Sequence, residues 1–171
     1  LAALQFTKGE FDNTKATLAN AANNGGAEAA ETNFNNALLA LVDNNTEDAA
    51  AFLGKAASIE QLNEAQGVLS IQKGEYAKAV EAFGNTVSNN AALAQLLSGN
   101  LDKATSILEN VTDKNANTYY LMAICAARAG DAAGVTANLA KVKELDEEMA
   151  KSALTDLEFA KFLAAEVAPV Q

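Results

Sequence analysis

Histidine and tryptophan are absent from this chain of 171 residues, which also contains a single cysteine and a single proline. Without histidine the chain can build no Ser–His or Cys–His nucleophile pair and no histidine-ligated metal site. The lone Cys125 can form neither an intrachain disulfide nor a thiolate zinc site, and its apolar neighbours predict a buried thiol. No glycine-rich loop is followed by Lys-Ser or Lys-Thr, as a phosphate-binding loop requires. These absences predict that the chain is not an enzyme and holds no cofactor or metal.

Positive charge is scarce as well. The formal net charge is −10 and the isoelectric point is about 4.4. An acidic chain is repelled by phosphate backbones, so we expect no nucleic-acid partner. The same acidity serves solubility or, alternatively, recognition of a basic partner. No apolar stretch reaches the length of a membrane span, so no direct membrane insertion is expected. Because the chain begins at Leu1 and not at methionine, we expect a piece of a longer protein.

What the chain does contain favours helices. Half of its residues are hydrophobic, and many of these are alanine, the residue with the highest helix propensity. The one proline, Pro169, lies at the C-terminal end, so little interrupts a helix elsewhere. A core of Ala, Leu and Val with few aromatics suits many thin helical layers. We therefore predict an all-α fold.

A short pattern recurs five times along the chain. A turn residue is followed by a usually apolar residue two positions later, a small or β-branched one five positions later, and a large apolar one nine positions later. Gly and Asn tolerate the left-handed conformation that ends a helix, and the later positions share one face of the next helix. The spacing centres on about thirty residues, typical of helix–turn–helix repeats. The second copy can be registered on Asn44 or on Asn45. The turn residues are Gly9, Asn44, Gly74, Gly99 and Gly130.

The segment 62–85 has Gly67 in its expected first helix, Gly74 and Tyr76 at the turn, and Ala79 and Phe83 in its expected second helix. Through these residues the segment resembles a tetratricopeptide repeat (TPR). The fifth copy matches through Tyr119, Met122, Ala123, Gly130 and Leu139. The family's first-helix tryptophan and its proline after the second helix are both missing. The resemblance extends unevenly over nearly the whole chain.

The resemblance implies a TPR-like α-α superhelix, a right-handed solenoid of antiparallel helix pairs. We predict one domain over residues 1–171, with about five pairs and a truncated first pair. Thr155 to Glu158 matches a capping box, followed by the apolar side chains of Phe159, Phe162 and Leu163. A helix near 156–166 is therefore predicted to cap the last hydrophobic face of the stack.

The family's exposed first-helix positions also imply where a partner would bind. Tyr120 and Arg128 are of residue types enriched at binding hot spots, although they could instead pack on a neighbouring repeat and end a helix. The groove offers too few Lys, Arg and Asn side chains for the family's carboxylate clamp. The implied partner-binding residues are Gln61, Glu64, Val68 and Gln72 in the third repeat and Asn117, Tyr120, Ile124 and Arg128 in the fifth.

The predicted function is therefore a non-catalytic protein–protein interaction module that binds a peptide or protein segment in the concave groove. The alternative is a structural spacer or assembly element within a multidomain protein. The chain is also similar to repeat domains of Gram-negative cell-envelope proteins, which would place it in the periplasm or at the outer membrane. The sequence predicts neither the partner's identity nor the oligomeric state.

Overall fold

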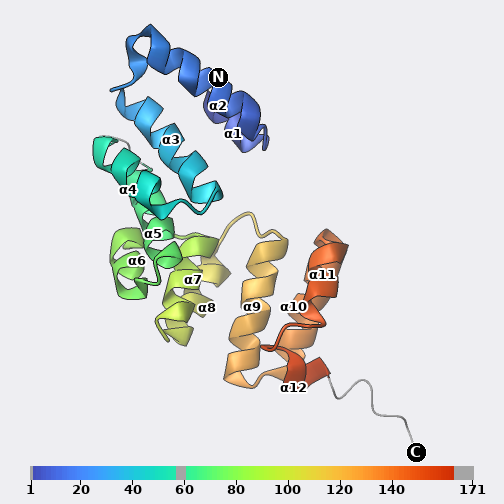
Figure 1. The fold of residues 1–171 in the computed structure, drawn as a ribbon. Coiled ribbons are helices and arrows are strands. Elements are labelled where there is room, and N and C mark those ends of the chain that lie inside the picture. Colours follow the sequence, from blue (N-terminus) through green and yellow to red (C-terminus); the bar gives the residue numbers. More distant parts are fainter. Residues whose placement is uncertain (1, 57–60, 164–171) are drawn as a thin grey trace, which may run out of the picture. The chain divides into compact units, whose positions relative to one another are not determined.

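The computed structural model describes residues 2–56 and 61–163, and every regular element in these ranges is a helix. Five antiparallel pairs follow one another along the chain (Figure 1). They are α1 (Ala2–Thr7) with α2 (Phe11–Ala21), α3 (Ala30–Val42) with α4 (Thr46–Lys55), α5 (Leu62–Gln72) with α6 (Tyr76–Phe83), α7 (Asn89–Leu97) with α8 (Leu101–Asn110), and α9 (Ala116–Ala129) with α10 (Ala132–Leu145). A kinked π-helical stretch, η1 (Ala22–Gly26), continues α2.

All five predicted turns have the same backbone geometry. The turn residue has a positive φ in each copy, including 53° at Asn44, the one non-glycine residue with positive φ in the described part of the chain. Its amide donates to the carbonyl three residues back, and the next amide donates to the carbonyl five residues back. At Gly74 these bonds run to Ile71 (2.9 Å) and from Glu75 to Ser70 (2.8 Å). This is the Schellman motif, which satisfies two carbonyls at the end of each first helix.

The residue after each turn residue is the N-cap of the second helix. In two of the five copies its side chain caps that helix: Asn45 Oδ1 accepts from the Asp48 amide at 3.2 Å, and Asp131 Oδ1 accepts from the Gly134 amide at 2.9 Å. The double register of the second copy is thereby resolved, because Asn44 takes the left-handed position and Asn45 the N-cap. In the other copies the N-cap side chain makes no such bond.

The core follows the predicted offsets. The small residue five positions after the turn is at most 1% exposed in every copy: Thr14, Ala49, Ala79, Ala104 and Val135. The large residue nine positions after it is buried in four copies, Leu18, Leu53, Phe83 and Leu108, and Leu139 is partly buried in the fifth. The small first-helix residue that the resemblance implied at Gly67 and Ala123 recurs in all five copies, where the residue seven positions before each turn is small and buried. These residues are Ala2, Ala37, Gly67, Ala92 and Ala123.

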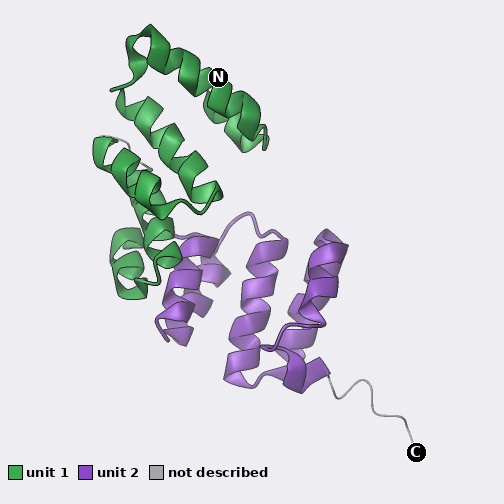
Figure 2. Ribbon diagram, viewed as in Figure 1, with its two compact units in different colours: residues 1–84 green, residues 85–171 purple. Residues whose placement is uncertain are grey.

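The chain divides into two compact units, residues 1–84 (unit 1) and 85–171 (unit 2), drawn in different colours in Figure 2. The boundary lies between two helix pairs, α5/α6 and α7/α8, and cuts through neither. Each unit has its own apolar clusters, with α3, α4 and α5 sharing one in unit 1 and α7, α8 and α9 sharing one in unit 2. The single domain expected from the sequence stays a prediction.

Unit 2 ends differently from the sequence expectation. After α11 (Glu147–Ala153) the chain turns, and among the described residues a helix, α12 (Ala160–Leu163), begins at Ala160 and not at the expected Asp156. The capping box does not form, because Thr155 Oγ1 donates to the Ser152 carbonyl and the Glu158 carboxylate binds Arg128. Residues 164–166 of the expected helix lie outside the described residues. The segment still covers an apolar face, since Phe159 is fully buried against Ala123, Val135 and Ala153.

Candidate peptide-binding surface

The starts of the first helices in unit 2 are tied together by amide side chains. Asn115 is the N-cap of α9 and forms a capping box with Thr118, whose amide donates to Asn115 Oδ1 at 3.0 Å. The same oxygen accepts from Asn89 Nδ2, in the first turn of α7, at 3.2 Å. These bonds hold the N-terminal ends of α7 and α9 beside each other. The exposed Asn117 lies in the first turn of α9.

Two neighbouring hollows open on these helices. One, of about 400 Å³, lies between α7 and α9, and the other, of about 480 Å³, lies between α9 and α11. Asn117 and Tyr120 line both, so the hollows form one continuous surface, which we call the α7–α9–α11 surface. The first hollow is completed by Asn89, Asn90, Leu93 and Leu121, and the second by Asp146, Glu148, Met149 and Ser152.

The two hollows differ in chemistry. The first combines amides with the aliphatic side chains of Leu93 and Leu121, whereas the second contains the carboxylates of Asp146 and Glu148. Asp146 Oδ1 caps α11 by accepting from the Met149 amide at 2.9 Å, and Glu148 forms an ion pair with Lys151 at 2.7 Å. No lysine or arginine lines either hollow. The surface therefore presents amides, apolar groups and negative charge.

Tyr120 has a structural contact as well as a place on this surface. Its hydroxyl donates to Asp156 Oδ2 at 2.6 Å, and its ring packs edge-on against Phe159 with ring centroids 5.4 Å apart. Burial, followed by the hydrogen bond and the charge of Asp156, raises the pKa of the Tyr120 phenol well above its usual range. Tyr120 thus holds the C-terminal segment against α9 while one side of it faces the hollows.

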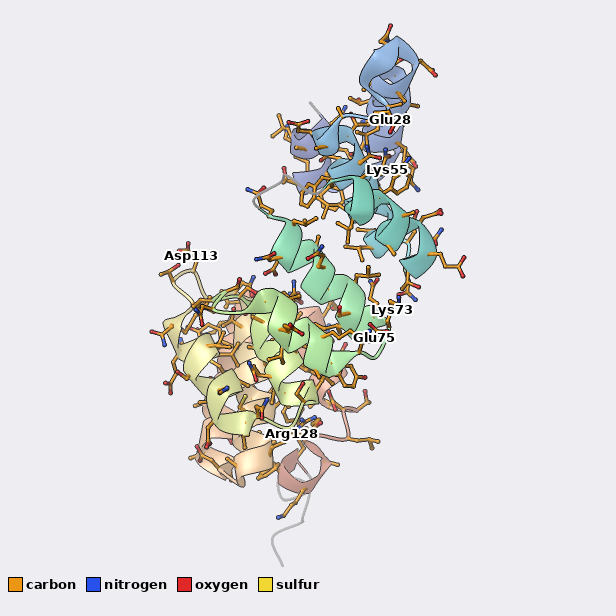
Figure 3. All side chains as sticks on the ribbon, turned by 90° about the vertical axis from the view of Figure 1, so that its left-hand side faces the viewer. Glu28, Lys55, Lys73, Glu75, Asp113 and Arg128 are labelled. Atoms are coloured by element: carbon orange, nitrogen blue, oxygen red, sulfur yellow. The ribbon has the colours of Figure 1, made fainter. Side chains whose placement is uncertain are left out.

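Arg128, which is labelled in Figure 3, lies in the last turn of α9 and binds other residues of unit 2. Its Nε lies 3.2 Å from both carboxylate oxygens of Glu158, and its Nη1 donates to the Leu96 carbonyl at 3.1 Å. The Glu158 hydrogen bond raises the pKa of the guanidinium further. Arg128 lines neither hollow. The fourth candidate of the fifth repeat, Ile124, packs into two apolar clusters of unit 2.

The third-repeat candidates lie on α5, in unit 1. Gln61 is exposed at the start of the helix, and Glu64 lies half-buried in its first turn. Val68 packs against the apolar cluster of α3, α4 and α5. Gln72 Nε2 donates to the Leu41 carbonyl at 2.8 Å and so ties the end of α5 to α3. Among the eight candidates, the structure brings Asn117 and Tyr120 together on one hollowed surface.

The residues that α7 contributes to this surface are not among the eight candidates predicted from the sequence. The third- and fifth-repeat candidates include residues ten and six positions before their turn glycines. The same offsets counted back from Gly99 identify Asn89 and Leu93, both of which line the first hollow. These two offsets therefore identify the α7 residues from the sequence alone. The contributions of α11 follow no repeat offset and required the structure.

The described part of the chain shows no metal site, no membrane-spanning helix and no reactive thiol. No group of three or more His, Cys, Asp or Glu side chains there is placed to hold a metal ion. None of the described helices has the length and apolar character to cross a membrane. Cys125 is buried, and burial raises the pKa of its thiol, which disfavours the reactive thiolate.

Comparison with known proteins identifies the fold. No protein-family model matches the sequence, and no curated protein sequence matches it. The structure is similar to a solved structure described as a tetratricopeptide repeat protein from Parabacteroides merdae ATCC 43184, with a TM-score of 0.69 and 17% sequence identity. The match covers 88% of this chain and 66% of that one, so the chain spans just under two thirds of its structural neighbour. The chain therefore has an all-α, TPR-like helical repeat fold, as its sequence predicted.

Proposed function

We propose that this chain is a non-catalytic protein-interaction module that binds a segment of a partner protein on the α7–α9–α11 surface. The observation that carries the proposal is the pair of hollows joined through Asn117 and Tyr120. An asparagine amide both donates and accepts, so it can pair with the N–H and C=O groups of a peptide. Leu93 and Leu121 offer apolar contact beside these amides. Together they suit a peptide segment.

The substitution that tests this surface must leave the helices intact. Tyr120 and Arg128 are unsuitable, because their side chains hold the C-terminal segment in place. Asn117 is exposed and lines both hollows, so Asn117→Lys adds bulk and charge to the surface without removing a core contact. Asn110→Lys is the matched control, since Asn110 is exposed at the end of α8 and lines neither hollow.

The experiment has two stages. Proteins captured from a lysate of the source organism are purified, and their affinities for wild type and both variants are measured by titration calorimetry. We expect at least one captured protein to lose about tenfold or more in affinity for Asn117→Lys and to bind Asn110→Lys normally, as a blocked central contact does. If every captured protein binds the two variants equally, partner binding at this surface is refuted.

A second proposal has its own observation in unit 2. Leu154 and Leu157 are 68% and 88% exposed, and Leu154 borders an apolar hollow of about 310 Å³ formed by α10, α11 and α12. Exposed apolar groups of this kind favour attachment to a further surface. They support a role as a structural spacer or assembly element, as in a multidomain cell-envelope protein. Concentration-dependent self-association in analytical ultracentrifugation, abolished by Leu154→Glu, would support that role.

A further inference from the structure

The chemistry of the two hollows bears on the kind of partner segment. This inference rests on the proposed function, because it assumes that the segment lies along the α7–α9–α11 surface. The hollow between α7 and α9 offers apolar and amide groups, and the hollow between α9 and α11 offers the carboxylates of Asp146 and Glu148. A segment that crosses Asn117 therefore meets a neutral environment at one end and an anionic one at the other.

Negative charge outweighs positive charge around the second hollow. The first turn of α11 carries Glu147 and Glu148 after the N-cap Asp146, and Asp156 lies beside Tyr120. The one lysine of α11, Lys151, forms ion pairs with both glutamates, at 3.6 Å to Glu147 and 2.7 Å to Glu148. The start of the α11 dipole offsets part of this charge. The net charge of α11 and its N-cap is nevertheless negative. The side chains of Glu147, Glu148 and Lys151 are each more than half exposed.

The first hollow also contains an unsatisfied acceptor. Asn89 Oδ1 is buried and has no hydrogen-bond partner among the described residues, while Nδ2 of the same amide donates to Asn115. A buried acceptor without a partner is costly, so a donor that reaches it gains affinity. The terminal torsion of an asparagine is soft, and a small rotation would turn this oxygen toward an N–H group lying beside Leu93. Both hollows thus favour a ligand rich in donors.

We propose that the partner segment is basic and extended, with an apolar side chain beside Leu93 and Leu121 and a lysine or arginine beside Asp146 and Glu148. A backbone N–H of the segment meets Asn89, and Asn117 binds the backbone between the two side chains. An acidic segment meets repulsion at α11 and finds no lysine or arginine lining either hollow. Charge complementarity of this kind selects partners and speeds their association more than it adds affinity.

The test uses a phage-displayed library of short random peptides, selected on the whole chain and counter-selected on Asn117→Lys. Selected peptides are synthesised, and their affinities are measured by fluorescence anisotropy. Glu148→Gln removes one carboxylate from the surface. The matched control is Glu144→Gln, because Glu144 forms an equivalent ion pair with Lys141, also at 2.7 Å, but lines neither hollow.

We expect the selected peptides to be enriched in lysine and arginine. Glu148→Gln should weaken them about two- to fivefold, as for one exposed ion pair, and Glu144→Gln should leave them unchanged. Added salt should weaken wild type and reduce its difference from Glu148→Gln. Peptides that require Asn117 but are neutral or acidic, or that bind Glu148→Gln as well as wild type, would overturn the basic partner and leave the proposed surface standing. A selection that yields no Asn117-dependent peptide would overturn both.

Discussion

Gly67 and Phe83 form a packing pair that distinguishes the third helix pair from the others. Seven positions before the turn, the other four pairs have alanine, and nine positions after it they have leucine. In the third pair these residues are Gly67 and Phe83. A Cβ built on Gly67 would lie 2.6 Å from two carbons of the Phe83 ring, well inside van der Waals contact. Phe83 is 3% exposed, so the ring has little room to move away.

This geometry allows the effect of Gly67→Ala to be worked out. In an open helix the substitution stabilises by about 0.5–1 kcal/mol, because alanine loses less conformational entropy than glycine. Here the added methyl group overpacks the core, at a cost of about 1–3 kcal/mol. We therefore expect a net loss of up to about 2.5 kcal/mol in the free energy of unfolding. The matched control is Gly54→Ala in α4, where nothing lies within 4 Å of the added Cβ, and there we expect a gain.

The double variant tests the reasoning most sharply. Phe83→Leu alone leaves a cavity and should cost about 1–2 kcal/mol. Gly67→Ala/Phe83→Leu recreates the Ala–Leu pair of the other repeats, so it should be more stable than either single variant, with a coupling of about 1–3 kcal/mol. Urea unfolding followed by far-UV circular dichroism measures all four free energies. Additive effects, or stabilisation by Gly67→Ala alone, would refute the packing argument.

Two further predictions concern single side chains. The pKa of Tyr120 is raised in the folded state, so its contribution to stability is fully present below the ordinary tyrosine pKa of about 10. That contribution is lost as pH rises above this value, and the free energy of unfolding falls by up to about 1.4 kcal/mol per pH unit. Urea titrations at increasing alkaline pH should therefore show the wild type losing its advantage over Tyr120→Phe, and parallel pH profiles would contradict this. At the second turn, Asn44→Gly should keep or slightly raise the unfolding midpoint, whereas Asn44→Ala should cost about 1 kcal/mol because φ is positive there. If Asn44→Ala unfolds at the same midpoint as wild type and Asn44→Gly, the positive φ at this position does not destabilise alanine.

The sequence predicted those parts of the fold that depend on residues close to one another along the chain. A Schellman turn needs one residue that tolerates positive φ and carbonyls within one helical turn of it, so Gly9 or Asn44 identifies it without tertiary information. The core positions five and nine residues later follow from helix geometry alone. The register of each helix pair is therefore readable from a few residues.

The end of unit 2 shows where such reading fails. Thr155 to Glu158 matches a capping box, yet Glu158 binds Arg128, thirty residues earlier in the chain. The hydroxyl of Tyr120 likewise pairs with Asp156 across 36 residues. A helical pattern places Tyr120 and Arg128 on a face of α9 but cannot say which segment covers that face. The sequence allowed Tyr120 and Arg128 either to bind a partner or to pack within the chain. In the structure both make long-range contacts within the chain, which no local pattern could predict.

The position six residues before the turn belongs to the core. In the last four pairs it is occupied by Leu38, Val68, Leu93 and Ile124, which are all aliphatic and partly buried, whereas Ala3 of the first pair is exposed. An aliphatic side chain there packs between helices, and Leu93 in addition lines the first hollow. The candidates Val68 and Ile124 therefore belong mainly to the core.

The position ten residues before the turn behaves in the opposite way. It is occupied by Phe34, Glu64, Asn89 and Tyr120, four side chains of different chemistry on the same face of successive first helices. The turn and the small core residue are the same in each pair whichever of these side chains is present, although Asn89 and Tyr120 also make contacts within unit 2. Side chains that differ while the turn and the core stay the same can specify a partner. We therefore expect Asn89 and Tyr120, together with the exposed Asn117, to determine specificity in unit 2.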